Sequence, residues 1–183
     1  MSNYSKAVEL LNSHIKNENL KKHCYGVEAC MRQYAHELGE DEERWAITGL
    51  LHDLDWESHP ETHPNTLIVW LKDAGFDDEI ITAILGHAYP DRTDVPRTTT
   101  MAHHLFACDE LSGFIVAYAL MKPGKLNDVD AKGVGKKLKD KRFAAGVNRD
   151  DIHTGIKEIG VDTETHITNV INALRNEKRL GLS

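Results

Sequence analysis

The chain has 183 residues and a formal net charge of −7, with 40% hydrophobic and 28% charged residues. This length allows one well-buried core and is short for two, and the composition excludes a disordered, collagen-like or coiled-coil protein. The negative net charge also argues against general nucleic-acid binding, which depends on clustered positive charge.

The sequence lacks the features of a secretion signal or a membrane span. Its longest apolar run, residues 114–121, is far too short to cross a bilayer and indicates a buried helix. Three cysteines, Cys24, Cys30 and Cys108, are scattered through apolar segments without a C-x-x-C spacing. We therefore expect a soluble, cytoplasmic protein whose cysteines are reduced core residues rather than metal ligands.

Apolar residues recur at helical spacing along almost the whole chain, and no stretch shows the sustained alternation of a strand. The sequence therefore predicts an all-α fold. Small polar or acidic residues such as Asp77 mark helix starts, and Gly39 is placed to end a helix. Loops with two prolines each cover residues 59–64 and 89–97. In chain order, the expected helices cover about residues 3–15, 20–38, 40–53, 65–73, 78–87, 98–122, 127–140, 149–159 and 163–178.

His52 and Asp53 stand next to each other at the end of a predicted apolar helix. Both lie on or beside its buried stripe, where an unpaired carboxylate is costly and needs a cation, a donor network or a metal. Neighbouring imidazole and carboxylate groups suit a borderline divalent cation such as manganese, iron or zinc. The alternative is a helix cap with a satisfied hydrogen bond, because the His-Asp dipeptide is common.

Two more polar residues lie on apolar helix faces. His23 shares its face with Val27, and Asp109 shares its face with Leu105. Two histidines and two carboxylates from three helices would make a compact site. We therefore predict that one divalent transition metal (Mn, Fe, Co, Ni or Zn) is bound by His23, His52, Asp53 and Asp109.

The order of these four residues resembles a known family. Together with the segments Gly49-Leu-Leu-His-Asp and Ala107-Cys-Asp-Glu-Leu, it is similar to the HD-domain superfamily of metal-dependent phosphohydrolases, over about residues 20–120. The stretch 134–149 resembles a subgroup that consists mostly of predicted HD hydrolases without a secure substrate.

This resemblance implies a single helical HD domain over residues 1–183. Its metal-binding core would cover about residues 20–120, and a helical extension would follow at about 125–183. The implied activity is metal-dependent hydrolysis of a nucleotide or another small phosphate ester, so the expected partner is a small phosphorylated molecule.

His63 and His87 are candidates for a second metal. In HD proteins with two metals, two histidines between the His-Asp pair and the last Asp bind the second ion, and the resemblance implies that Asp53 would bridge the two ions. The alternative is that His63 is a loop residue and that His87 is favoured at a helix C-terminus by the helix dipole. The pair His103-His104 points more than about a quarter-turn away from Asp109 and is not expected to share its ion.

An acid is expected near the metal to deprotonate or orient the attacking water. Asp55 and Glu57 follow the His-Asp pair where some relatives carry such an acid, and Glu57 is the predicted catalytic residue. A basic stretch at residues 132–142, together with Arg149, is either a solvated helix face or a docking surface for the substrate phosphate.

Two other functions fit the same residues. Some HD-fold proteins are oxygenases that use a di-iron pair, and six ligands including His63 and His87 would permit that chemistry. The other alternative is a non-catalytic nucleotide-binding or regulatory domain in which the metal is structural. The sequence does not identify the substrate, the metal or the oligomeric state.

Overall fold

The computed structural model describes residues 2–183, and within this range all regular elements are helices, which confirms the predicted fold class. No helix in this range is both long and apolar enough to cross a membrane. In chain order, the elements are α1 (Asn3–His14), α2 (Glu18–Leu38), α3 (Glu42–Leu51), α4 (Leu67–Asp73), α5 (Asp78–His87), α6 (Thr100–Ala119), the 3-10 turn η1 (Lys125–Asp128), α7 (Ala131–Leu138), α8 (Arg149–Ile159), α9 (Thr163–Asn176) and η2 (Lys178–Leu180).

One expected helix is interrupted. The predicted helix at 127–140 is a short 3-10 turn followed by α7. The break has a local cause, because the carboxylate of Asp130 accepts a hydrogen bond from the backbone N–H of Gly133 and caps a new helix there. A carboxylate at a helix start competes with continued helix on its N-terminal side, which hydrophobic spacing does not reveal.

Most helix ends are fixed by the residues at their termini. Gly39 and Gly160 end α2 and α8 with φ angles of 72° and 68°, a backbone conformation that favours glycine. At the N-termini, a side-chain oxygen accepts a hydrogen bond from a backbone N–H of the first turn. The residues that do so on the α-helices are Ser2, Asn17, Asp41, Asp77, Thr99, Asp130, Asn148 and Asp162.

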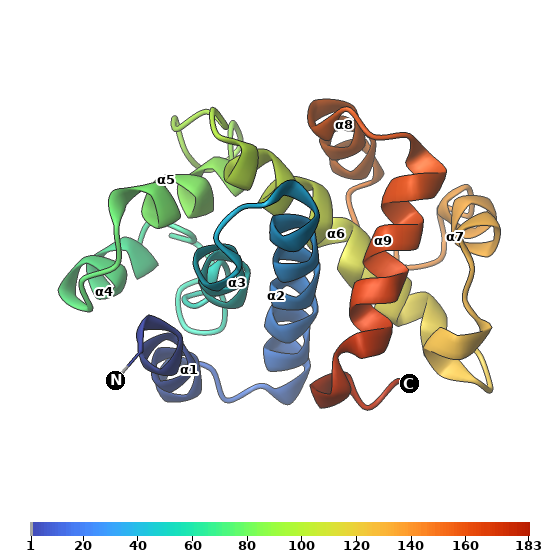
Figure 1. Cartoon of the computed structure of the whole chain (residues 1–183), viewed down its shortest axis with the longest axis horizontal. Helices are drawn as coiled ribbons and strands as arrows, with labels where there is room; N and C mark the ends of the chain where they lie inside the picture. The colour runs from blue at the N-terminus through green and yellow to red at the C-terminus, as the bar shows by residue number, and fades with distance from the viewer. Residues whose placement is uncertain (1) are drawn as a thin grey trace.

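The helices α2 and α6 organise the rest of the fold. Figure 1 shows α2 beside α3, with α6 crossing behind α2 and α9; α6 also packs against α5 and α8. The helices α4 and α5 lie at one end of the molecule, and α7 lies at the other (Figure 1). A continuous cluster of buried apolar residues includes residues from α1 to η2. That continuity is consistent with one domain over the whole chain, which stays a prediction.

Glycines let two helix pairs approach unusually closely. A Cβ at Gly49 would lie 2.9 Å from backbone atoms of Val27 and Glu28, so the backbones of α3 and α2 are in contact there. A Cβ at Gly155 would lie 2.6 Å from the Cα of Ala107, which brings α8 equally close to α6. Because His52 follows Gly49 by three residues, the first contact sets how near His52 comes to α2.

Candidate metal centre

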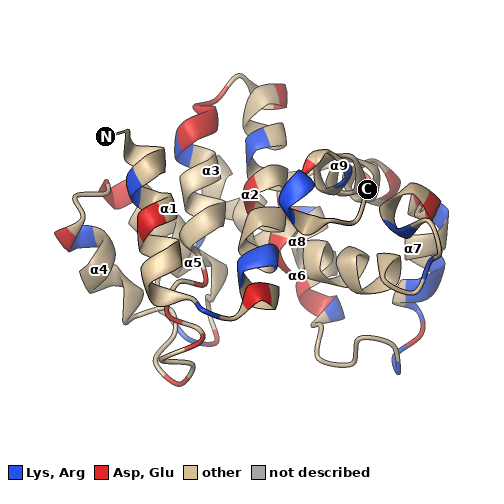
Figure 2. Ribbon diagram, turned by 90° about the horizontal axis from the view of Figure 1, so that it is seen from below, with Lys and Arg blue, Asp and Glu red and all other residues tan. Residues whose placement is uncertain are grey.

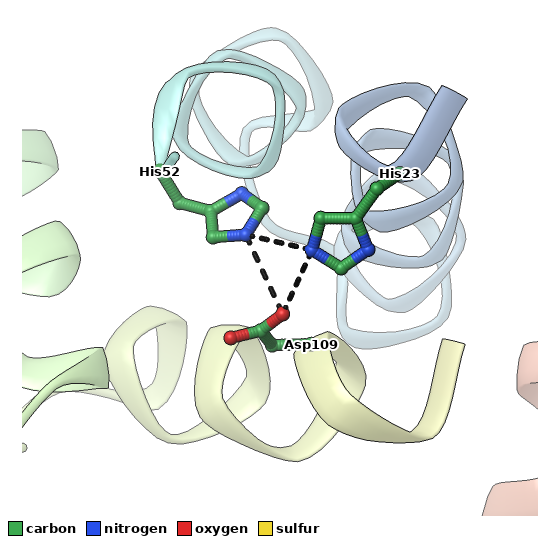
Figure 3. A group of neighbouring side chains, drawn as sticks. All are labelled: His23, His52 and Asp109. Carbon is green, nitrogen blue, oxygen red and sulfur yellow. Dashed lines mark hydrogen bonds and ion pairs between the residues drawn. The ribbon is translucent and has the colours of Figure 1, made fainter. Parts of the chain in front are cut away.

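Three helices bring His23, His52 and Asp109 together. His23 lies on α2, His52 directly follows α3, and Asp109 lies in the middle of α6. The Nε2 atoms of the two histidines are 3.2 Å apart, and Oδ1 of Asp109 lies 3.0 Å from the Nε2 of His23 and 3.4 Å from that of His52 (Figure 3). These three atoms enclose a space in which one cation could be bound.

A second group lies next to the first. It consists of Asp53, His63 and His87, whose ligand atoms also lie close enough to hold one ion. The Nε2 of His63 is 3.2 Å from the Nε2 of His87 and 3.5 Å from Oδ1 of Asp53. His63 comes from the loop before α4, and His87 is the last residue of α5. Both histidines are almost fully buried.

Asp53 lies between the two groups and presents one carboxylate oxygen to each. Its Oδ2 is 3.6 Å from the Nε2 atoms of both His23 and His52, whereas its Oδ1 faces His63. The side chain is 14% exposed, so its charge is largely removed from water. A carboxylate in this position can contribute a ligand to two cations at once.

The second nitrogen of three of the four histidines is held by the protein. Nδ1 of His52 lies 2.8 Å from the carbonyl oxygen of Gly49, and Nδ1 of His87 contacts the carbonyl oxygen of Ile84. Nδ1 of His63 lies 2.6 Å from the carboxylate of Asp55, which is fully buried and also accepts the N–H of Leu67 at 3.0 Å. Because carbonyls and carboxylates only accept hydrogen bonds, each Nδ1 carries a proton, and in the neutral ring each Nε2 presents a lone pair.

These tautomers make the centre unfavourable without a cation. The Nε2 lone pairs of His63 and His87 face each other at 3.2 Å, beside an oxygen of Asp53. In a buried site, acceptors that face one another lack the donor that would repay their desolvation. A divalent cation between them is the partner that neutral imidazole and carboxylate groups prefer. The residues present therefore fit a metal centre.

Burial and the neighbouring charges shift the pKa values of the histidines and carboxylates in the centre. Burial alone would lower the pKa of His52, but the carboxylates of Asp53 and Asp109 outweigh burial and raise it to about 9. Burial opposes ionisation of Asp109, yet His52 and His23 hold the pKa of Asp109 well below its usual range. Burial, followed by the nearby His52, lowers the pKa of His87 to about 4. The negative potential that favours a proton on His52 equally favours a metal cation at its Nε2.

A cavity of about 550 Å³ opens onto the centre. Within the described range, Arg92 is the only Lys or Arg that lines it, whereas several acidic residues do. The guanidinium of Arg92 lies 5.3 Å from the ring centre of Trp56 and donates a hydrogen bond of 2.7 Å to the carbonyl of Pro60. The lining residues are Leu20, His23, Asp53, Trp56, His63, His87, Ala88, Tyr89, Pro90, Asp91, Arg92, Phe106, Asp109, Glu110, Gly113, Val147 and Asp151.

Glu110, for which the sequence predicts no role, lines this cavity next to Asp109. Its carboxylate accepts the N–H of Asn148 at 3.3 Å. Burial, with the charge of Asp109, raises the pKa of Glu110 to about 7, and cations at the centre would lower it again. Its position directly after a predicted ligand on the same helix could have indicated a role at the site. The sequence around Arg92 gives no such indication, because Arg92 lies in a loop.

Glu57, the predicted catalytic residue, does not line the cavity. Its carboxylate accepts backbone N–H groups of Lys16 and Asn17 at 2.8 and 2.9 Å, between α1 and α2. These hydrogen bonds lower the pKa of Glu57. This placement argues against action on a metal-activated water. Asp55, the other candidate in this segment, instead orients His63.

The basic stretch at 132–142 also lies away from the cavity. Its blue segments in Figure 2 gather on and after α7, far from α3 and α5. Arg149 is occupied as well: its guanidinium donates hydrogen bonds only to backbone carbonyls. The placement favours the solvated-face interpretation over a phosphate-docking role. The carbonyls bonded to Arg149 belong to Asp140, Phe143, Ala144 and Val147.

Three other histidines on α6 and α9 have partners away from the centre. Nδ1 of His103 lies 2.8 Å from Glu158, and Nδ1 of His104 lies 2.8 Å from the carbonyl of Thr100. As expected from helical geometry, neither joins Asp109. His166 on α9 is fully buried between Tyr34 and the carbonyl of Ala107. The cysteines Cys24, Cys30 and Cys108 are buried and unpaired.

The comparison with known families agrees with this geometry. The HD domain family matches residues 20–119, more than half of the chain and nearly the range expected from the ligand order. No curated protein and no solved structure matches the chain. The matched range contains all six residues of the two ligand groups. The chain therefore belongs to the HD domain family, within the superfamily of metal-dependent phosphohydrolases.

Proposed function

We propose that the protein hydrolyses a small phosphate ester at a centre of two divalent transition metals. In this proposal, His23, His52 and Asp109 bind one ion, His63 and His87 bind the other, and Asp53 bridges them. The placement of Asp53 carries the proposal, because its two carboxylate oxygens face different ligand groups at 3.5 and 3.6 Å. When bound, such metals supply Lewis-acid activation of water and of phosphoryl oxygens.

The protein's own contribution begins with binding of the phosphate. Arg92 is the cavity's cationic side chain, and its contacts with Trp56 and Pro60 restrict its motion. One of its five N–H donors is used by the Pro60 carbonyl, which leaves others for phosphate oxygens. We assign Arg92 the task of holding the phosphate against the centre.

We assign proton transfer to Glu110 because of its position in the cavity. Glu110 lines the cavity beside Asp109 and has no ion-pair partner in the described part of the chain, so it can hold a proton or pass one to the leaving oxygen. Asp55 contacts no space open to substrate, and it acts by fixing the tautomer and orientation of His63. The cavity volume of about 550 Å³ suits a small phosphate ester.

The test combines metal content with turnover. The purified protein is stripped by chelation and reloaded separately with Mn²⁺, Fe²⁺, Co²⁺, Ni²⁺ or Zn²⁺, and bound metal per chain is counted by mass spectrometry. Phosphate release is then measured from a panel of nucleotides and small phosphomonoesters. We expect two metals per chain and turnover that is lost in Asp53→Ala, while the exposed Glu57→Gln variant keeps both.

The alternatives have distinct outcomes. Two irons per chain with oxygen consumption and no phosphate release would identify a di-iron oxygenase, which the same six ligands permit. Binding of phosphate esters without turnover, together with a large loss of stability on chelation, would identify a non-catalytic domain. One metal per chain that supports full turnover would contradict the bridging role of Asp53.

A further inference from the structure

A second cavity lies beside the metal centre. It has a volume of about 330 Å³ and is formed between α2, α6 and the C-terminal segment. Most of its walls are apolar, and Leu120 at its edge is 66% exposed. Its apolar lining consists of Gly26, Gly113, Val116, Ala117, Leu120, Leu180 and Leu182. Its polar lining consists of Asn19, Lys22, His23 and Ser112.

The two cavities share part of their walls. His23 and Gly113 line both, so the apolar cavity begins where the metal-centre cavity ends. A Cβ at Gly113 would make an ordinary van der Waals contact with the ring of His23, at 3.8 Å from Nδ1, so Gly113 lies directly beside the edge of this ring. A larger residue here would stand between the cavities. The absence of a side chain at Gly113 therefore leaves more room where the two cavities adjoin.

The Nδ1 side of the His23 ring faces this boundary. When Nε2 of a histidine binds a metal, Nδ1 must carry a proton, and a ligand histidine almost always donates that N–H to an acceptor. His52, His63 and His87 have such acceptors, whereas Nδ1 of His23 has none within residues 2–183. Figure 3 shows this nitrogen pointing away from His52 and Asp109. Because the His23 side chain is 23% exposed, this N–H is open to solvent, and it marks the boundary where the two cavities adjoin at Gly113.

Resting on the proposed function, we infer that the substrate is a phosphomonoester of an apolar alcohol. Its phosphate lies at the centre, and its alkyl or aryl group passes Gly113 and the edge of the His23 ring into the second cavity. The cavity volume is at the lower end of the usual range for small-molecule sites, which suits a short chain or one ring. Burial of that group would supply affinity that the acid-lined first cavity cannot.

Binding of two phosphonates to the metal-loaded protein tests this inference without turnover. Hexylphosphonate and methylphosphonate carry the same head group and differ by five methylenes. Each methylene that enters an apolar cavity strengthens binding by about fourfold, so calorimetry should show hexylphosphonate binding more tightly by at least about tenfold. Equal affinity of the two compounds would overturn the inference.

Variants locate the effect. Ala117 lines only the second cavity, and Ala117→Trp fills it, so the preference for hexylphosphonate should disappear while methylphosphonate binding is kept. Met121→Trp is the control, since Met121 is 60% exposed and lines neither cavity. If Ala117→Trp fails to fold, Leu120→Asn changes an exposed position and should reduce the preference by several-fold. A preference that survives both changes contradicts the inference.

Hydrolysis separates this inference from the proposed function. Turnover of methyl phosphate, with no gain in kcat/KM for hexyl phosphate, would overturn the apolar substrate and leave the hydrolase intact. Tight binding of hexylphosphonate without hydrolysis of either ester would support the apolar binding site and contradict the hydrolase. Failure of both phosphonates to bind contradicts both ideas. If Ala117→Trp instead halves the molecular mass in light scattering, the cavity seats a second copy of the chain, and the inference is wrong.

Discussion

Buried histidines contact polar partners in two regions of this molecule, and only in one region does the protein supply both a donor and an acceptor to the ring. At α9, the hydroxyl of Tyr34 lies 2.5 Å from Nδ1 of His166, whose Nε2 lies 3.0 Å from the carbonyl of Ala107. At the centre, the Nε2 atoms of His63 and His87 lie 3.2 Å apart, although neither carries a proton to share. The first imidazole is satisfied by the protein alone. The second pair has no donor from the protein between its two rings, and a bound cation could take that place.

This difference explains how the same residue type is used in two ways. A neutral imidazole has one donor and one acceptor, so a hydroxyl on one side and a carbonyl on the other complete its bonding. A carbonyl or carboxylate at Nδ1 instead directs a lone pair outward, and a second such ring nearby creates a metal site. A second imidazole or a carboxylate facing Nε2, rather than burial, therefore distinguishes the proposed ligands from the structural histidines His104 and His166.

The largest effect is expected at the residue between the two ligand groups. Asp53→Ala removes an oxygen from each group, so metal content should fall for both ions and turnover should drop by more than about 100-fold, the upper end for changes in outer-shell residues. Metal counting and phosphate release check this. Asp94→Ala, at an exposed loop residue, should leave both values unchanged. Loss of only one metal would show that Asp53 serves one group.

The contact between α2 and α3 offers a way to disturb the first group alone. Gly49→Ala places a Cβ within 2.9 Å of the α2 backbone, so the helices must separate at a cost of about 3 kcal/mol in unfolding free energy. His52 would move away from His23, and the first ion should bind more weakly. The helical Gly135 has open space around it, so Gly135→Ala should stabilise the protein by about 0.5–1 kcal/mol. Chemical denaturation measures both changes, and equal effects would contradict the role of the close contact.

The second group depends on the buried carboxylate behind His63. Asp55→Asn removes the charge that orients this ring, and we expect the affinity of the second group for its ion to fall by roughly 10- to 100-fold. The first group should be unaffected. The control Glu57→Gln makes the same chemical change on a carboxylate outside the cavity. Metal titration distinguishes them, and a loss confined to the first ion would refute the assignment.

The smallest effect concerns the histidine that needs no metal. Burial, opposed by the Ala107 carbonyl, lowers the pKa of His166 to about 4, below the value of about 6.5 in an unfolded chain. The unfolded state therefore binds more protons between these values, so stability falls as the pH is lowered through this window. From pH 7 to pH 5, the loss from His166 amounts to about 2 kcal/mol.

The variant His166→Gln tests this value. Glutamine keeps a donor for the Ala107 carbonyl but does not titrate, so the loss of stability between pH 7 and pH 5 should be smaller by about 2 kcal/mol. Denaturant unfolding of metal-free protein at both pH values measures it, because protonation of the metal ligands is then common to both proteins. An identical pH dependence in variant and wild type would show that His166 is protonated without cost.

Helical periodicity predicted the fold and most of the centre for a clear physical reason. A polar residue on an apolar helix face must enter the core, which made His23 and Asp109 recognisable without coordinates. The family assignment and the all-helical fold are confirmed. The metal assignments themselves stay predictions, although the geometry brings all six residues into two adjoining groups.

Residues outside regular helices were harder to place. Asp55 and Glu57 lie in turns, where the spacing of residues does not predict which way a side chain points. The carboxylate of Asp55 lies in the core behind His63, whereas that of Glu57 lies at Asn17. Arg92 and the basic stretch depend on how distant segments dock, which local sequence does not encode. Long-range packing therefore decided which charges reach the cavity.

The guanidinium of Arg149 has a consequence for how this protein can vary. Every acceptor it uses in the turn before α8 is a main-chain oxygen, and that turn carries Val147 to the cavity wall. Main-chain oxygens are the same for all amino acids. Homologous chains could therefore exchange most side chains of this turn and preserve its shape, provided that the arginine is kept. One arginine would then keep the shape of this cavity wall while the other side chains of the turn change.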